Sequence, residues 1–171
     1  MRRLFLLRHA KSAWDDPALS DFERPLAPRG KKAAPLMGRE MTRRGWLPDL
    51  AVVSSAVRTR ETWELAGALL PAPCRTHFTE AIYEAAPWHI LAEINSVPDE
   101  VGNLLVVGHN PGLELLARML AGPGSAASAL NRLNARFPTA AIASLEVESD
   151  WAELGAASAR LTDIITPREL G

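Results

Sequence analysis

Two cationic side chains stand next to each other directly after a short apolar run. Arg8 and His9 follow the sequence Leu4-Phe5-Leu6-Leu7. The planar guanidinium of an arginine can hold two phosphate oxygens at once. A neighbouring positive charge disfavours imidazolium, so the histidine is biased toward its neutral form, whose free ring nitrogen is a nucleophile. The pair therefore indicates chemistry on an anionic, phosphate-like group.

Two more residues of this kind occur far along the chain. Arg58 lies in the first turn of a predicted helix, where a cation opposes the helix dipole at a cost of about 0.3–1 kcal/mol. A bound anion at that helix N-terminus would remove the cost; alternatively, Arg58 is a solvated surface residue helped by nearby Glu61. His109 follows another apolar run. Taken singly, both His9 and His109 also fit ordinary structural or loop histidines.

Alternating strand and helix patterns must position these residues. Short continuous apolar runs predict buried strands, and apolar residues at helical spacing predict helices between them. The predicted strands are Arg3–Leu7, Leu50–Val53, Arg75–Phe78, Leu104–Val107, Ala140–Val147 and Ala159–Ile165, the last two antiparallel. The predicted helices are Lys31–Arg44 closed by Gly45, Ala56–Leu70, Trp88–Ser96, and one from Asn110-Pro111 to about Ala121. Ser54 and Ser55 are predicted to cap the second helix, and residues 15–30 and 122–125 to form loops.

This alternation predicts an α/β layered sandwich with a mostly parallel sheet. In such sheets, ligands bind in the crevice beyond the carboxyl ends of the strands. Arg8 and His9 follow the first strand, Arg58 begins the helix after the second, and His109 follows the strand at 104–107. We therefore expect three separate segments to deliver cationic or titratable groups to one edge of the sheet.

Size and composition narrow the class of protein. A chain of 171 residues predicts a single domain over residues 1–171. The formal charge of −1 gives no basic excess for a nucleic acid or an anionic membrane. The N-terminal apolar run is shorter than that of a signal peptide, no stretch approaches a membrane span, and the lone Cys74 excludes an internal disulfide. A soluble cytoplasmic protein is expected.

Three segments, taken together, resemble the histidine phosphatase superfamily, the phosphoglycerate-mutase-like fold. Arg8-His9-Ala10 resembles its Arg-His-Gly signature, the segment from Ser55 to Thr62 resembles its second block, and Gly108-His109-Asn110-Pro111 resembles its Gly-His-Asn-Pro motif. The order and wide spacing match, and the resemblance covers most of the chain. The small size and Arg24-Pro25-Leu26 are similar to the short SixA-like branch, the phosphohistidine phosphatases.

The resemblance implies a three-layer α/β/α sandwich and a phosphatase that uses neither a metal nor another cofactor. It implies that His9 is the nucleophile and becomes a phosphohistidine. It implies that the phosphoryl oxygens are held by Arg8, Arg58 and His109, with Ser12 and Asn110 as further phosphate-binding residues. The implied substrate is a phosphohistidine-bearing protein or a small phosphorylated molecule, and the product is inorganic phosphate.

Ala10 departs from the family pattern, and Glu84 allows two interpretations. Ala10 replaces the signature glycine, so we expect conventional backbone there, because alanine largely loses access to positive φ. Glu84 matches the general acid of the larger family better than Glu80 does, since it follows Ile82 and Tyr83 in a Leu-x-Glu-like pattern. The SixA-like branch often lacks this acid, so Glu84 is equally consistent with a solvated carboxylate.

Rival functions remain open at this point. A metal hydrolase would use His9, His77, His89 and His109, although no paired-ligand spacing is present and two arginines would repel the cation. A binding module would hold a phosphorylated ligand without turnover. A broad phosphomonoesterase on small phosphate esters would need Glu84 as its acid.

Overall fold

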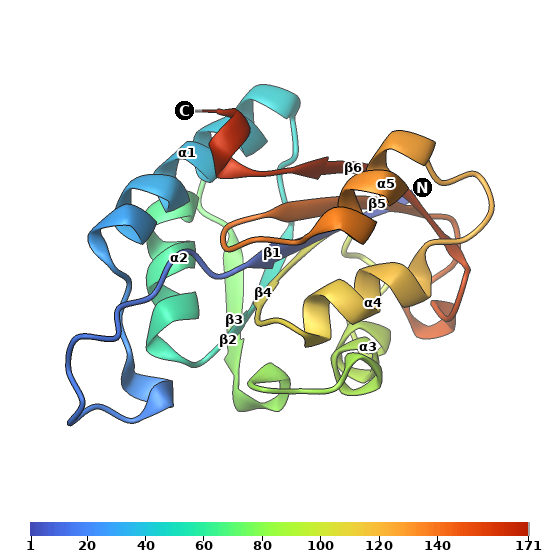
Figure 1. The fold of residues 1–171 in the computed structure, drawn as a ribbon. Helices are drawn as coiled ribbons and strands as arrows, with labels where there is room; N and C mark the ends of the chain where they lie inside the picture. Colours follow the sequence, from blue (N-terminus) through green and yellow to red (C-terminus); the bar gives the residue numbers. More distant parts are fainter. Residues whose placement is uncertain (171) are drawn as a thin grey trace.

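One six-stranded sheet runs through the molecule (Figure 1), in the order β3-β2-β4-β1-β5-β6. The computed structural model describes residues 1–170. The neighbouring pairs β3–β2, β2–β4 and β4–β1 are parallel, and β5 is antiparallel to both β1 and β6. The strands are β1 (Arg2–Arg8), β2 (Leu50–Ser54), β3 (Arg75–Thr79), β4 (Asn103–Gly108), β5 (Ile142–Val147) and β6 (Ala159–Ile165). The expected mostly parallel α/β sheet is confirmed.

Helices cover both faces of this sheet. They are α1 (Pro28–Arg44), α2 (Val57–Gly67), α3 (Pro87–Asn95), α4 (Gly112–Leu120) and α5 (Ala127–Ala135). Alternate residues of β1 enter the two cores: Leu4 and Leu6 pack with α3, α4 and α5, whereas Phe5 and Leu7 pack with α1 and α2. This period of two accounts for the continuous apolar run, because each face of the strand is buried. Among the described residues, no helix is long and apolar enough to cross a membrane.

The strand register brings the two histidines together. Arg8 of β1 is paired with Gly108 of β4, so His9 and His109 each follow directly after the same row of the sheet. Val53 of β2 is paired with Val107, which places Ser54 in the row next to Gly108. Residues about a hundred positions apart in the sequence therefore meet at the carboxyl edge of the parallel strands.

Several local predictions need correction. The α5 helix is not predicted by the sequence pattern, and α1 begins at Pro28 rather than Lys31, because proline suits the first helical turn. The second helix ends at Gly67, before Leu70. Its N-cap is Ala56 and makes no side-chain capping bond, so capping by Ser54 and Ser55 is wrong. Gly45, at a φ of 71°, closes α1 as expected.

Close packing of α1 on α2 fixes the helix that carries Arg58. Gly38 of α1 lies against the backbone of Ala66 in α2, where an added Cβ would overlap the Ala66 carbonyl group. Any larger residue at this position would push the two helices apart. Only glycine allows this approach without a shift of one backbone.

We expect Gly38→Ala to destabilise the protein by about 1–3 kcal/mol, because overpacking outweighs the better helix propensity of alanine. Gly155→Ala is the matched control, since the nearest atom to its added Cβ lies 3.9 Å away. Urea denaturation of the three proteins measures the free energies of unfolding. Equal stability of Gly38→Ala and the control would contradict the close-packing argument.

Candidate active site

His9 is buried in a state suited to nucleophilic attack. Its Nδ1 lies 2.7 Å from the Ala10 carbonyl oxygen, which can only accept, so Nδ1 carries the proton and Nε2 keeps its lone pair. Burial, followed by the charges of Arg58 and Arg8, lowers the pKa of His9 to about 4, against the opposing effect of the Ala10 hydrogen bond. His9 is therefore neutral near pH 7. The side chain is only 7% exposed.

The residue after His9 supports this arrangement. Ala10 is fully buried and does not have positive φ, as expected. Its backbone N–H donates to Thr62 Oγ1 at 2.9 Å, and the Thr62 hydroxyl donates to the Arg58 carbonyl oxygen at 2.7 Å. These bonds tie the end of β1 to α2.

His109 lies beside His9, with the ring centroids 5.4 Å apart. Its Nε2 is 2.7 Å from Ser54 Oγ, and Ala56 N–H approaches the same oxygen at 3.4 Å. Ser54 Oγ accepts from Ala56, and His109 Nε2 is the acceptor that its own hydroxyl proton meets within the described residues, so we assign that proton to the bond with His109. Burial, together with the neighbouring His9 and Arg58, lowers the pKa of His109 to about 3. Neutral His109 then carries its proton on Nδ1.

Arg58 is not the solvated surface arginine of the alternative interpretation, because it is only 5% exposed. Its Nη1 donates to the Asp21 carbonyl oxygen at 2.7 Å and its Nη2 to Asp21 Oδ2 at 3.0 Å. Glu61 does not help it; instead, Glu61 accepts from the backbone N–H of Leu26 at 2.8 Å. Asp21 therefore holds the Nη1 and Nη2 end of the Arg58 guanidinium.

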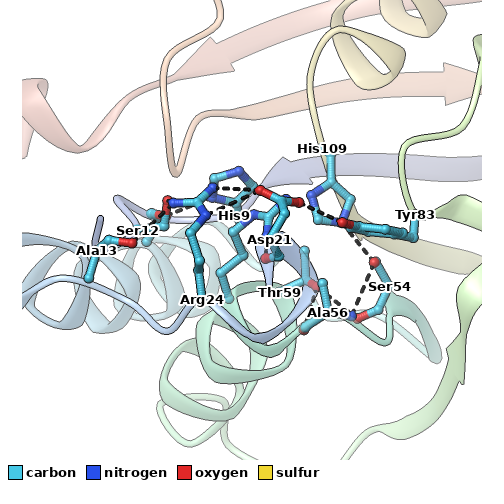
Figure 2. A network of polar contacts seen from close by, with 12 residues as sticks. His9, Ser12, Ala13, Asp21, Arg24, Ser54, Ala56, Thr59, Tyr83 and His109 are labelled. Carbon is cyan, nitrogen blue, oxygen red and sulfur yellow. Dashed lines mark hydrogen bonds and ion pairs between the residues drawn. The ribbon is translucent and has the colours of Figure 1, made fainter. Parts of the chain in front are cut away.

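Asp21 joins three parts of the site (Figure 2). Besides Arg58, Tyr83 donates its hydroxyl proton to Asp21 Oδ2 at 2.5 Å, and Arg24 contacts Oδ1 at 3.1 and 3.2 Å. Partial burial raises the pKa of Asp21, but the hydrogen bonds from Tyr83 and Arg58 outweigh it and lower the pKa to about 2. Asp21 is therefore an ionised anchor at neutral pH.

Three buried nitrogens of the site have no hydrogen-bond partner in the described part of the chain: Arg8 Nε, Arg58 Nε and His109 Nδ1. A buried unpaired donor costs about 1–3 kcal/mol, so such groups are rarely left without a function. The three donors come from β1, α2 and the segment after β4, and the charges of Arg8 and Arg58 act on both histidines. Their arrangement can bind the oxygens of one anion next to His9 Nε2.

The remaining predicted site residues lie in different surroundings. Ser12 Oγ accepts from Arg24 Nη1 at 2.8 Å, and Asn110 donates to the Phe137 carbonyl oxygen at 3.0 Å and accepts from the Glu114 N–H. Both side chains thus hold neighbouring loops. Glu84 is exposed, next to Tyr83, with a left-handed φ of 50°.

Sequence reasoning missed three residues of the site. Asp21 and Tyr83 lie in segments with no apolar period, and the sequence pattern indicates only a helix-capping role for Ser54. The usable signal for Asp21 was Ser20-Asp21-Phe22-Glu23, which forms a capping box and places Asp21 three residues before Arg24. Contacts with Arg58 and Tyr83 depend on the fold and leave no local pattern.

The four histidines of the metal hydrolase hypothesis do not come together. His77 is on β3, lining a hollow with Glu93, and His89 is an exposed residue of α3. Within residues 1–170 there is no group of three or more His, Cys, Asp or Glu side chains with ligand geometry. The histidines therefore do not form the ligand set that this hypothesis requires.

Comparison with known proteins identifies the family. Residues 4–86 match the Histidine phosphatase superfamily (branch 1). A structure from Nakamurella multipartitia, provisionally described as the phosphohistidine phosphatase SixA, is 33% identical, with a TM-score of 0.82 and coverage of 97% of this chain and 96% of that one. The chain belongs to the histidine phosphatase superfamily.

Further relatives extend this likeness. A second structure provisionally described as SixA, from Agrobacterium tumefaciens, is 29% identical, with a TM-score of 0.80 and coverage of 97% and 98% of the two chains. An uncharacterized protein of Mycobacterium tuberculosis is 41% identical over 169 residues, covering 95% of this histidine phosphatase and all of the relative. The match over whole chains supports the SixA-like branch.

One prediction for this site concerns the protonation of His9. Long-range ¹H–¹⁵N spectra follow the titration of the His9 ring, and the His9→Gln protein assigns its signal. The titration midpoint of His9 should lie near pH 4. Because the pKa of His9 is lower in the folded than in the unfolded protein, the unfolded state binds the proton more tightly. The contribution of His9 to stability is therefore complete above about pH 6.5 and is lost as the pH falls toward 4. The loss amounts to roughly 3 kcal/mol. A midpoint near 6.5 would contradict the neutral nucleophile.

A second prediction tests the Ser54–His109 bond. Ser54→Ala should shift the His109 proton away from Nδ1 in ¹⁵N spectra and lower kcat for phosphate release about tenfold, the worth of one hydrogen bond. The control is Ser144→Ala, which removes another buried hydroxyl, from β5. An unchanged tautomer in Ser54→Ala would refute the assignment.

Proposed function

We propose that this protein is a metal-independent phosphatase that hydrolyses phosphohistidine in cytoplasmic proteins through a covalent phosphohistidine at His9. The observation that carries this proposal is the set of three buried, unpartnered nitrogens beside the free Nε2 of His9. A phosphoryl group has three peripheral oxygens, and its transfer depends mainly on in-line position and on stabilisation of charge at those oxygens. The buried donors and the free Nε2 of His9 support both requirements.

In the first step, His9 Nε2 attacks the phosphorus, a new P–N bond forms, and the P–N bond to the substrate imidazole breaks. Arg8, Arg58 and His109 donate N–H bonds to the three peripheral oxygens. Because the guanidinium groups are fixed by Phe137 and Asp21, they need little reorganisation during the reaction. The second ring nitrogen of the substrate imidazole carries a proton taken up from solvent, so the bonding electrons leave with a neutral imidazole.

In the second step, water attacks the phosphorus of phosphorylated His9. The P–N bond to His9 breaks, inorganic phosphate leaves, and the water proton is released, so His9 returns to its neutral state. Splitting the hydrolysis at a covalent intermediate replaces one difficult displacement by two easier ones.

The proton balance favours a phosphohistidine substrate. An alkoxide leaving group must be protonated as its bond breaks, whereas imidazole is far less basic. Asp21, the carboxylate at the centre of the site, has a pKa of about 2 and is fully engaged, so it is not a proton donor at neutral pH. Glu84 is exposed beside Tyr83. The likeness to the SixA structures also supports this substrate.

Glu84→Gln separates this proposal from a broad phosphomonoesterase. With EDTA present, wild type should hydrolyse a phosphohistidine peptide faster than an alkyl phosphate, and Glu84→Gln should change the peptide rate less than twofold. An alkyl phosphate rate that equals the peptide rate and falls by about 10²–10⁴ in Glu84→Gln would identify the esterase. Binding of the peptide without turnover would identify a binding module, and loss of activity in EDTA would refute metal independence.

A further inference from the structure

Three arginines line one hollow near the site, outside the residues assigned to phosphate. Arg132 and Arg136 come from the end of α5 and the loop after it, and Arg168 comes from the turn Pro167–Glu169. We call these three residues the arginine surface. The hollow has a volume of about 200 Å³ and also contains Thr166.

The strand register places the arginine surface at the catalytic edge. Leu7 of β1 is paired with Ile142 of β5, and Ile142 is paired with Ile165 of β6, so these three residues form one row across the sheet. Since β6 runs in the same direction as β1, Arg168 follows β6 on the side where His9 follows β1. In Figure 1 the loop after α5 and the C-terminal turn lie at this same end of the sheet.

Direct hydrogen bonds connect the loop after α5, which carries Arg136, to the end of β1. Phe137, the residue after Arg136, accepts from Arg8 Nη1 at 3.1 Å. The backbone N–H of Ala140 approaches the carbonyl oxygens of Arg8 and His9 at 3.1 and 3.0 Å. The loop that carries Arg136 is thus held against the end of β1, so a ligand of the arginine surface would lie beside the phosphoryl pocket.

The charge of this surface is poorly balanced. Arg132 forms an ion pair with Glu169. Arg136 and Arg168 are both exposed, and neither has an ion pair within residues 1–170. The whole protein has a formal charge of −1, so this positive concentration is local. Arg136 and Arg168, which have no ion pair in this part of the chain, suit a surface that meets carboxylates.

We infer that the arginine surface binds acidic side chains of the substrate protein that flank its phosphorylated histidine. This inference rests on the proposed function and adds a specificity site to it. The phosphoryl group occupies the pocket at His9, while carboxylates on the same partner meet Arg136 and Arg168. Complementary charge of this kind raises the rate of productive encounter and selects among partners, and salt screens it.

Two phosphohistidine peptides test the inference, identical except that glutamates or glutamines flank the phosphorylated residue. Wild type should give about tenfold higher kcat/KM with the glutamate peptide at 50 mM salt, and the preference should vanish at 500 mM. Arg136→Glu/Arg168→Glu should abolish or reverse it while leaving the glutamine peptide unchanged. Arg39→Glu/Arg75→Glu is the control: it makes the same change in net charge at exposed positions on α1 and at the start of β3.

The outcomes separate the two proposals. Equal kcat/KM for both peptides in wild type, or an equal loss in the control variant, overturns the inference and leaves the proposed function standing. If neither peptide is hydrolysed, the proposed function fails and the inference fails with it. A single-stranded RNA that inhibits wild type but not the double variant would assign the surface to nucleic acid and also overturn the inference. Thermal melting of each variant confirms that the proteins compared are folded.

Discussion

The ionised carboxylate of Asp21 is the interaction on which the site depends. It connects the loop after β1, the first turn of α2 and the segment after β3, through Arg58 and Tyr83. Its negative charge offsets the cost of burying Arg58, which would otherwise be a lone charge in the first turn of a helix. Asp21 accepts one N–H from each of Nη1 and Nη2, so it fixes the plane of the guanidinium and leaves the buried Nε without a protein partner, free for a ligand.

The pairing of β1 with β4 adds the second constraint. It sets His9 and His109 side by side, in a place where burial and the arginine charges keep both rings neutral. Each ring is then fixed in one tautomer by a single neighbour: the Ala10 carbonyl group for His9 and Ser54 for His109. The two histidines therefore differ in role because their partners differ: His9 keeps a free lone pair as a nucleophile, and His109 keeps a proton as a donor.

Sequence patterns predicted β1, β2 and β4 because buried parallel strands are continuous apolar runs. The same runs pointed to four candidate site residues near the strand ends, whose catalytic roles stay predictions: Arg8, His9, Arg58 and His109. The α5 helix escaped prediction because it is short and rich in small and polar residues; it is stabilised by Ala129 and Leu133 packing on the core rather than by propensity. Asp21 and Tyr83 escaped for a related reason: their roles arise from contacts between distant segments. That residues 1–171 form one domain stays a prediction, and so does the choice for Glu84 between a general acid and a solvated carboxylate.

The central claim is that neutral His9 takes the phosphoryl group. Rapid quenching of the protein during turnover of a ³²P-phosphohistidine peptide tests it most directly. We expect a label that is stable in alkali, lost in mild acid, mapped to His9, and absent from a folded His9→Ala protein. An acid-stable label, or labelling that persists in His9→Ala, would contradict it.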